Sequence, residues 1–169
     1  MVDHIERSDL IEWAHHEHLH LSRLFDDLRV TFNRIALGEL DGAAREDALD
    51  QAVEDLEVAL DDMLEHFNEE EEVYFLAIEQ RFPEYSEQIT ALKDAHEDIC
   101  TKTQTLQRHL RSQRDQIATM SAALIALINE VAVAVERHNA GEHEVFDLAL
   151  ARLSEDDRIE LMVRKKSLG

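Results

Sequence analysis

The chain has 169 residues, of which 44% are hydrophobic and 33% charged, with only 4 glycines, 1 proline and a formal net charge of −21. This length suits one domain, residues 1–169, with a substantial core, and the shortage of glycine and proline favours long helices. The strong negative charge argues against nucleic acid or an anionic membrane surface as a partner.

Apolar residues recur at helical spacing, and the sequence lacks the alternation typical of strands, so we expect an all-α fold. The first helix is predicted to begin near Ser8 or Asp9, because Asp9 and Glu12 have the spacing of a capping box. It should end near Leu37, since Gly38 suits the C-terminal stop of a helix.

The second helix is expected to run from about Ala43 to Arg81, with Asp41 as its N-terminal cap. Pro83 separates this helix from the third, because its fixed φ suits a first helical turn. The end of the third helix falls within the polar stretch 111–116, which contains no helix-breaking residue.

The fourth helix is predicted over roughly Gln116 to Arg152. Ser154 and Asp157 have the spacing of a cap for a short final helix that reaches to about Lys165. Four long amphipathic helices joined by short loops predict an up-down-up-down four-helix bundle, followed here by a short C-terminal fifth helix.

A histidine precedes a glutamate by four residues at two places, His66 with Glu70 and His138 with Glu142. On a helix this spacing places both side chains on one face, and both pairs lie within apolar stripes. A carboxylate that faces a core needs a compensating partner, and a metal cation is the usual one. Two such pairs, on helices expected to sit diagonally in the bundle, predict a site with two metal ions.

The other two long helices must then supply the remaining ligands, and helix geometry selects among their histidines. At about 100° per residue, His18 lies near the apolar stripe of the first helix, whereas His15 lies about 105° from the centre of the stripe and is either a neighbour of the ligands or a surface residue. By the same geometry His16 and His20 point to the opposite side. His96 lies in line with the apolar residues of the third helix. A single inward histidine is more often a hydrogen-bonded core residue, so the prediction depends on the whole set.

Four imidazoles and two carboxylates suit iron, manganese or zinc, and six ligands for two ions leave coordination positions for a small molecule. A zinc-filled or metal-free structural bundle is the alternative. The run from His16 to His20 also matches the HExxH signature of zinc peptidases, but it lacks the accompanying elements, and we favour a solvated helix face.

Two further residues have open interpretations. Cys100, four residues after His96, is a reactive thiol, an extra ligand or a small core residue, and we favour the last. Gly141 either leaves space for a small ligand beside the metals or is a tolerated surface glycine. With one cysteine, no apolar signal core at the N-terminus and no bilayer-length apolar run, the protein is expected to be cytoplasmic.

Taken together, these motifs resemble the hemerythrin-like, or HHE cation-binding, proteins over nearly the whole chain. The resemblance rests on a histidine in the opening helix, two His-x-x-x-Glu pairs and a lone histidine on the third helix. It implies a four-helix bundle that holds a non-haem di-iron centre, bridged by two carboxylates and an oxo or hydroxo group. Carried over residue by residue, it implies His18, His66, His96 and His138 as terminal ligands, and Glu70 and Glu142 as bridges.

Oxygen-carrying hemerythrins have a second histidine at the position of Cys100, and they close with an aspartate five residues after the last histidine, where this chain has Glu142 at four. The chain therefore resembles more closely the bacterial and iron-sensing branch, in a stand-alone form. That branch is associated with oxygen, iron or nitric-oxide responses, iron–sulfur repair and peroxide decomposition. We predict a di-iron protein that reacts with H2O2, O2 or NO, with peroxide decomposition in stress defence as the first hypothesis. A non-catalytic sensor or storage module is the alternative.

Overall fold

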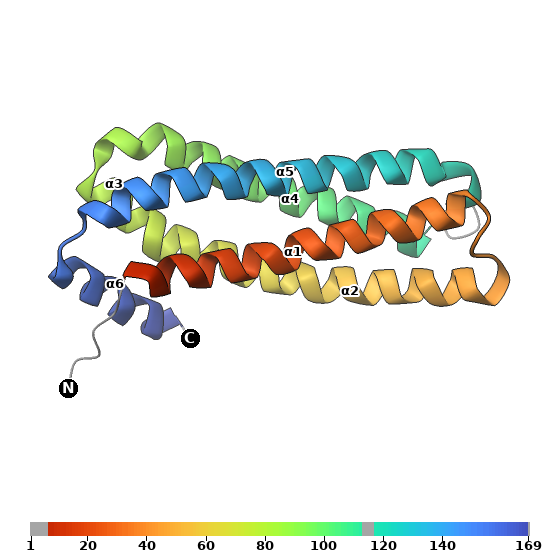
Figure 1. Ribbon diagram of the computed structural model, residues 1–169, viewed down its shortest axis with the longest axis horizontal. Helices are drawn as coiled ribbons and strands as arrows, with labels where there is room; N and C mark the ends of the chain where they lie inside the picture. Colours follow the sequence, from red (N-terminus) through yellow and green to blue (C-terminus); the bar gives the residue numbers. More distant parts are fainter. Residues whose placement is uncertain (1–6, 113–116, 169) are drawn as a thin grey trace.

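The structure, a computed structural model, describes the backbone of residues 7–112 and 117–168 and the side chains of residues 18–112 and 122–167. These residues form a bundle of four long helices with a short helix at one end (Figure 1), and no strand occurs among them. The expected all-α bundle with a short fifth helix is confirmed. The elements are α1 (Arg7–Ala36), α2 (Gly42–Glu69), a π-helical turn η1 (Glu70–Phe75), α3 (Leu76–Arg81), a 3-10 turn η2 (Pro83–Tyr85), α4 (Ser86–Ser112), α5 (Ile117–Arg152) and α6 (Glu155–Leu168).

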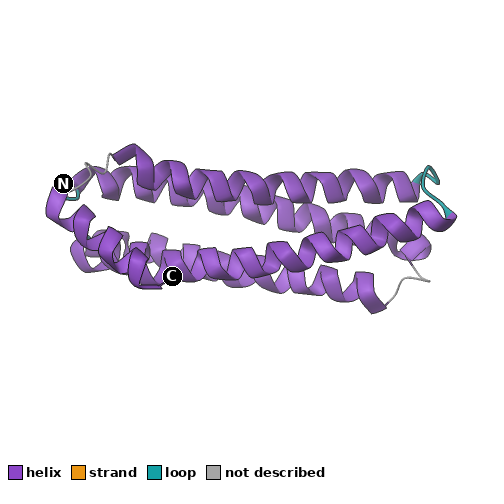
Figure 2. Ribbon diagram, turned by 90° about the horizontal axis from the view of Figure 1, so that it is seen from below, coloured by secondary structure: helices purple, strands orange, loops and turns teal. Residues whose placement is uncertain are grey.

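The long helices run along one common axis, and the loops are confined to the ends of the bundle (Figure 2). Helix α5 packs most closely against α1 and α4, and α2 packs against α4 and, less closely, against α1. Since α2 and α5 are both neighbours of α1 and α4, the two helices that carry the His-x-x-x-Glu pairs sit diagonally, as expected. None of the helices in the described part of the chain has the length and apolarity needed to cross a membrane.

The core consists of two apolar clusters separated along the bundle axis. The larger cluster includes Phe25 and Phe32 of α1 and Leu106 of α4. The smaller one surrounds Tyr74 and Phe146 near the end where α6 packs against η1. The buried polar residues described below lie between the two clusters, so the bundle encloses them on both sides.

The end of α1 has the hydrogen bonds of a Schellman motif around Gly38, whose φ is +72°. The Gly38 N–H donates to the Ile35 carbonyl at 3.0 Å, and the Glu39 N–H donates to the Arg34 carbonyl at 2.9 Å. This pattern requires a left-handed residue after the helix, which glycine adopts without a steric penalty. The predicted stop at Gly38 is confirmed.

Replacing Gly38 with alanine is expected to lower the free energy of unfolding by about 1–2 kcal/mol, because a Cβ disfavours left-handed backbone. Denaturant unfolding followed by circular dichroism measures this change. Gly141→Ala is the control, since Gly141 has no positive φ and its added Cβ would lie 3.5 Å from Leu92 Cδ2, an ordinary contact. That variant should be neutral or more stable by up to about 1 kcal/mol. Equal losses in both variants would contradict the role assigned to Gly38.

The predicted helix caps have different outcomes. Ser154 and Asp157 form a reciprocal cap, because the Ser154 N–H donates to Asp157 Oδ2 at 3.1 Å and the Asp157 N–H donates to Ser154 Oγ at 3.2 Å. Asp41 occupies the N-cap position of α2, as predicted, but its side chain accepts no capping hydrogen bond. Gly42, with a φ of +49°, turns the chain away from regular helical geometry directly after Asp41. The proposed Asp9–Glu12 capping box lies outside the residues whose side chains are described.

The second predicted helix, Ala43 to Arg81, is helical throughout but is not one regular α-helix. The π-turn η1 interrupts it between α2 and α3, and the sequence has no glycine or proline there to indicate this. Val73, Tyr74 and Phe75 are consecutive and at most 2% exposed. An α-helix at about 100° per residue cannot turn three consecutive side chains to one side, and here α6 contacts η1 in addition to the long helices. Pro83 begins η2, which separates α3 from α4 as predicted.

Candidate metal centre

The six residues predicted as metal ligands come together in the middle of the bundle. Each is at most 7% exposed, and among the described residues the one other buried polar side chain is Thr103. The Thr103 hydroxyl donates to the Ile99 carbonyl of the same helix, so its hydrogen bond is satisfied within α4 and it is not part of this cluster. The six come from all four sides of the bundle: His18 from α1, His66 from α2, Glu70 from η1, His96 from α4, and His138 and Glu142 from α5.

The carboxylate of Glu70 extends between imidazoles on two sides. Its Oε1 lies 2.7 Å from His66 Nε2 and 3.5 Å from His18 Nε2. Its Oε2 lies 3.1 Å from His96 Nε2. The two oxygens of one side chain therefore face different histidines, which is the arrangement that a bridging carboxylate needs.

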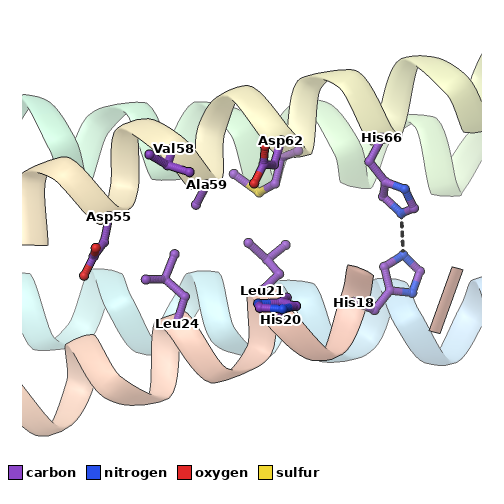
Figure 3. Close-up of a pocket in the computed structure, with 10 residues that line it drawn as sticks. His18, His20, Leu21, Leu24, Asp55, Val58, Ala59, Asp62 and His66 are labelled. Carbon is purple, nitrogen blue, oxygen red and sulfur yellow. Dashed lines mark hydrogen bonds between the residues drawn. The ribbon is translucent and has the colours of Figure 1, made fainter. Parts of the chain in front are cut away.

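Glu142 makes the second connection. Its Oε2 lies 3.1 Å from His18 Nε2 and 3.2 Å from His138 Nε2. The histidines also approach each other: His18 and His66 have their Nε2 atoms 3.1 Å apart and point toward one another (Figure 3). The rings of His96 and His138 have their centroids 4.6 Å apart. The four histidines thus form two close pairs.

Most of these short contacts lack the direction of a hydrogen bond. Both oxygens of Glu70 and of Glu142, both ring nitrogens of His138, and Nε2 of His96 are buried without a hydrogen-bond partner. Burying such groups unbonded destabilises a fold, by about 1–3 kcal/mol for each group in mutational data. Atoms of His18, Glu70, His138 and Glu142 lie within 4.8 Å of one another and are able to hold a metal ion. When the lone pairs of several oxygen and nitrogen atoms point toward one buried space, a cation is the partner that can bind them all.

The ionisation of the cluster also fits the binding of a cation. Burial raises the pKa of Glu70, but the imidazoles of His18, His66 and His96 outweigh it and keep this pKa well below its usual range. Burial and the charge of Glu70 raise the pKa of Glu142 well above its usual range. Burial and the neighbouring His96 lower the pKa of His138 to about 3. The protein alone therefore stabilises one of the two carboxylates as an anion, whereas a bound dication would stabilise both.

A family comparison agrees with this geometry. The model of the hemerythrin HHE cation binding domain matches residues 9–149, which is most of the chain. The chain belongs to the hemerythrin HHE family. Membership implies iron binding, and the buried His/Glu cluster is the place in the described structure that suits a metal. No curated protein and no solved structure shows significant similarity to the chain.

Two cavities approach the cluster of this hemerythrin domain from different faces. The first, of about 420 Å³, lies between α1 and α2, with apolar walls that include Leu21 and Met63 and with His18 and His66 at its inner end (Figure 3). The second, of about 380 Å³, lies between α4 and α5 and is lined by His138 and Gly141. Small molecules therefore have space beside histidines of both pairs.

The structure corrects one prediction for the first helix and leaves others open. His20 is exposed, as predicted, but it lines the cavity between α1 and α2 and so does not point away from the site. His18 and Leu21, close to His20 on the same helix, line this cavity as well. The side chains of His15 and His16 lie outside the described residues. Exposure of His20 agrees with the reading of the HExxH match as a solvated helix face.

The environment of Cys100 agrees with its interpretation as a small core residue. The side chain is half-buried and packs against the larger apolar cluster. Burial and the charge of Glu71 raise its pKa, which stabilises the neutral thiol and disfavours the thiolate that binds metals. Gly141 is partly buried in the wall of the α4–α5 cavity, so it is not simply a surface glycine.

Sequence reasoning missed the side chains that surround His96. Its ring stacks on Phe67, with centroids 3.8 Å apart and planes at 8°, and its centroid also lies 5.5 Å from that of the nearly parallel ring of Phe75. Its Nδ1 lies 2.7 Å from Glu71 Oε1. The sequence shows that Glu71 follows Glu70 in an acidic run. It does not show that Glu71 contacts His96, which lies 25 residues away in the chain.

Proposed function

We propose that this hemerythrin-family chain is a non-haem di-iron protein, in which four imidazoles and two carboxylates would hold the ions. The observation that supports this most directly is the set of buried carboxylate oxygens and imidazole nitrogens that have no hydrogen-bond partner. The close pairs, His18 with His66 and His96 with His138, suggest which histidines share an ion. The proposed ligands are His18, His66, Glu70, His96, His138 and Glu142.

We further propose that the centre decomposes hydrogen peroxide. Two iron ions, when bound, would supply the two-electron redox chemistry, and six protein ligands would leave coordination positions for a small molecule. One H2O2 is reduced to two waters by two electrons and two protons, and a second H2O2 releases those electrons and protons as it becomes O2. The reaction thus needs no other reductant or oxidant, which suits a site whose cavities admit small molecules.

The chain itself contributes the ligands, the exclusion of bulk water and the routes of access. Phe67 and Val73, from the two apolar clusters, stand on either side of Glu70 in the sequence and are buried. The largely apolar walls of the α1–α2 cavity and the acidic surface favour an uncharged ligand over an anion. Hydrogen peroxide, dioxygen and nitric oxide all meet this requirement.

The deciding experiment measures oxygen evolution from peroxide by the iron-loaded chain. An enzyme should release O2 over many turnovers, with one O2 for every two peroxides consumed. The alternative function, a non-catalytic sensor or storage module for oxygen, nitric oxide or iron, predicts spectral changes that saturate at stoichiometric ligand and no turnover. That second outcome would leave the di-iron centre in place and remove the peroxide activity.

Gly141→Leu is expected to slow the reaction with peroxide or azide by about tenfold, equivalent to about 1.4 kcal/mol. The alanine Cβ at this position already reaches contact with Leu92, so a leucine side chain must extend into the α4–α5 cavity. Stopped-flow absorbance of the iron-loaded protein measures the rate, and Gly141→Ala serves as the control with an unchanged rate. Unchanged reactivity in Gly141→Leu would show that ligands do not use this cavity.

A further inference from the structure

The contact between His96 and Glu71 connects a proposed ligand to a residue outside the ligand set. Since a carboxylate accepts, the Nδ1–H of His96 donates to Glu71 Oε1 across 2.7 Å. The other ring nitrogen, Nε2, faces Glu70 Oε2 at 3.1 Å. Consecutive glutamates therefore contact the opposite nitrogens of one imidazole. The Glu71 side chain is 38% exposed, so it remains solvated while its oxygen reaches the buried ring.

This arrangement depends on the π-turn. Glu70 and Glu71 are the first two residues of η1. In an α-helix consecutive side chains diverge by about 100°, whereas a π-turn has more residues per turn and a smaller angle between neighbours. The turn that interrupts the second helix thus brings two adjacent carboxylates to the same ring, which explains its position at the site.

Stacking and hydrogen bonding constrain His96 in different ways. Phe67 and Phe75, nearly parallel to the imidazole at 8° and 15°, fix the plane of the ring. Stacking does not distinguish the two orientations related by a 180° rotation about the Cβ–Cγ bond. A fixed acceptor for Nδ1–H does distinguish them, because the rotated ring would present carbon to Glu71 and leave Nε2 misplaced. The same bond selects the tautomer with a lone pair on Nε2.

His138 provides a comparison within the same site. Neither of its ring nitrogens has a hydrogen-bond partner among the described residues. The paired histidines therefore differ: His96 has the Glu71 carboxylate as an acceptor for its Nδ1–H, and His138 has no such acceptor in the described part of the chain.

We propose that Glu71 is a positioning residue for the metal centre: it orients His96, fixes its tautomer and adds negative charge to the iron ion that His96 binds. This inference rests on the proposed di-iron function. A carboxylate behind an imidazole increases the basicity of the ligand, so Glu71 should strengthen metal binding at that ion and stabilise Fe(III) relative to Fe(II).

Three variants of the full chain separate these effects. Glu71→Ala removes the acceptor and the charge, Glu71→Gln keeps an oxygen acceptor without the charge, and Glu72→Gln changes the same charge at an exposed neighbour. Chelator competition measures the affinity of each ion, and redox titration of the iron-loaded protein measures the midpoint potential. Nitrogen-15 NMR of the metal-free protein reports the His96 tautomer.

Glu71→Ala is expected to lower the affinity for one of the two ions by about 10- to 100-fold and to lose the fixed Nδ1–H tautomer. Glu71→Gln should retain the tautomer, lose less affinity and raise the midpoint potential, which an effect on packing alone would not do. Glu72→Gln should match the wild type. Wild-type affinity, tautomer and potential in both Glu71 variants would overturn the inference. Absence of metal from the wild-type chain would instead overturn the proposed function on which it rests.

Discussion

Glu70→Ala is expected to remove most of the bound iron and all peroxide turnover. The two oxygens of Glu70 face His66 and His96, at 2.7 and 3.1 Å, so this one side chain contacts both halves of the proposed centre. Loss of a shared ligand weakens both ions at once, and we expect affinity to fall by more than about 100-fold, or about 2.7 kcal/mol. Elemental analysis of the purified variant and oxygen evolution from peroxide measure the two losses.

Glu72→Ala is the matched control for this experiment. Glu72 lies in the same π-turn and carries the same charge, but its side chain is exposed. It should retain the iron content and turnover of the wild type. A Glu70→Ala protein with wild-type iron content would show that the metal binds elsewhere.

Removal of the metal is expected to give the second large effect, a loss of stability of about 3–4 kcal/mol relative to protein in excess free metal. The estimate follows from mass action, since a ligand at 100 to 1,000 times its dissociation constant stabilises the folded state by about 2.7 to 4.1 kcal/mol. The physical origin is a group of buried oxygen and nitrogen atoms of Glu70, Glu142 and His138 that have no hydrogen-bond partner. A bound metal ion would give these atoms a partner. Thermal and denaturant unfolding of the metal-free and iron-loaded proteins measure the difference.

A calcium-loaded sample, at the same ionic strength, is the control for metal removal. Calcium prefers six to eight oxygen ligands, so it should bind poorly to a site with four imidazoles and should not stabilise the folded protein. Equal unfolding curves for the metal-free and iron-loaded proteins would mean that the cluster holds no ion in the folded state.

The sequence predicted the fold because its signals were local and frequent. Few glycines and prolines, apolar residues at helical spacing and a stop at Gly38 each act within one helix, and the structure agrees with them. The convergence of the six polar residues was also predictable, since an inward position on an amphipathic helix follows from its stripe. Their role as metal ligands stays a prediction.

The features that sequence reasoning missed depend on contacts between distant elements. The π-turn η1 has no breaker to mark it, and one of the elements that pack against it, α6, follows about 80 residues later. Glu71 looks like any member of an acidic run until His96 is placed beside it. Asp41 has the residue type of a cap and lies at the N-cap position, but whether its side chain makes the capping hydrogen bond depends on local backbone geometry, and here it does not.

The most direct test of a di-iron centre is the number of iron ions bound by the wild-type chain. The apoprotein is saturated with Fe(II) without oxygen, freed of excess metal by gel filtration, and analysed for iron and protein. The arrangement of two histidine pairs around two carboxylates predicts two iron ions per chain. A saturated value of one or fewer would contradict it.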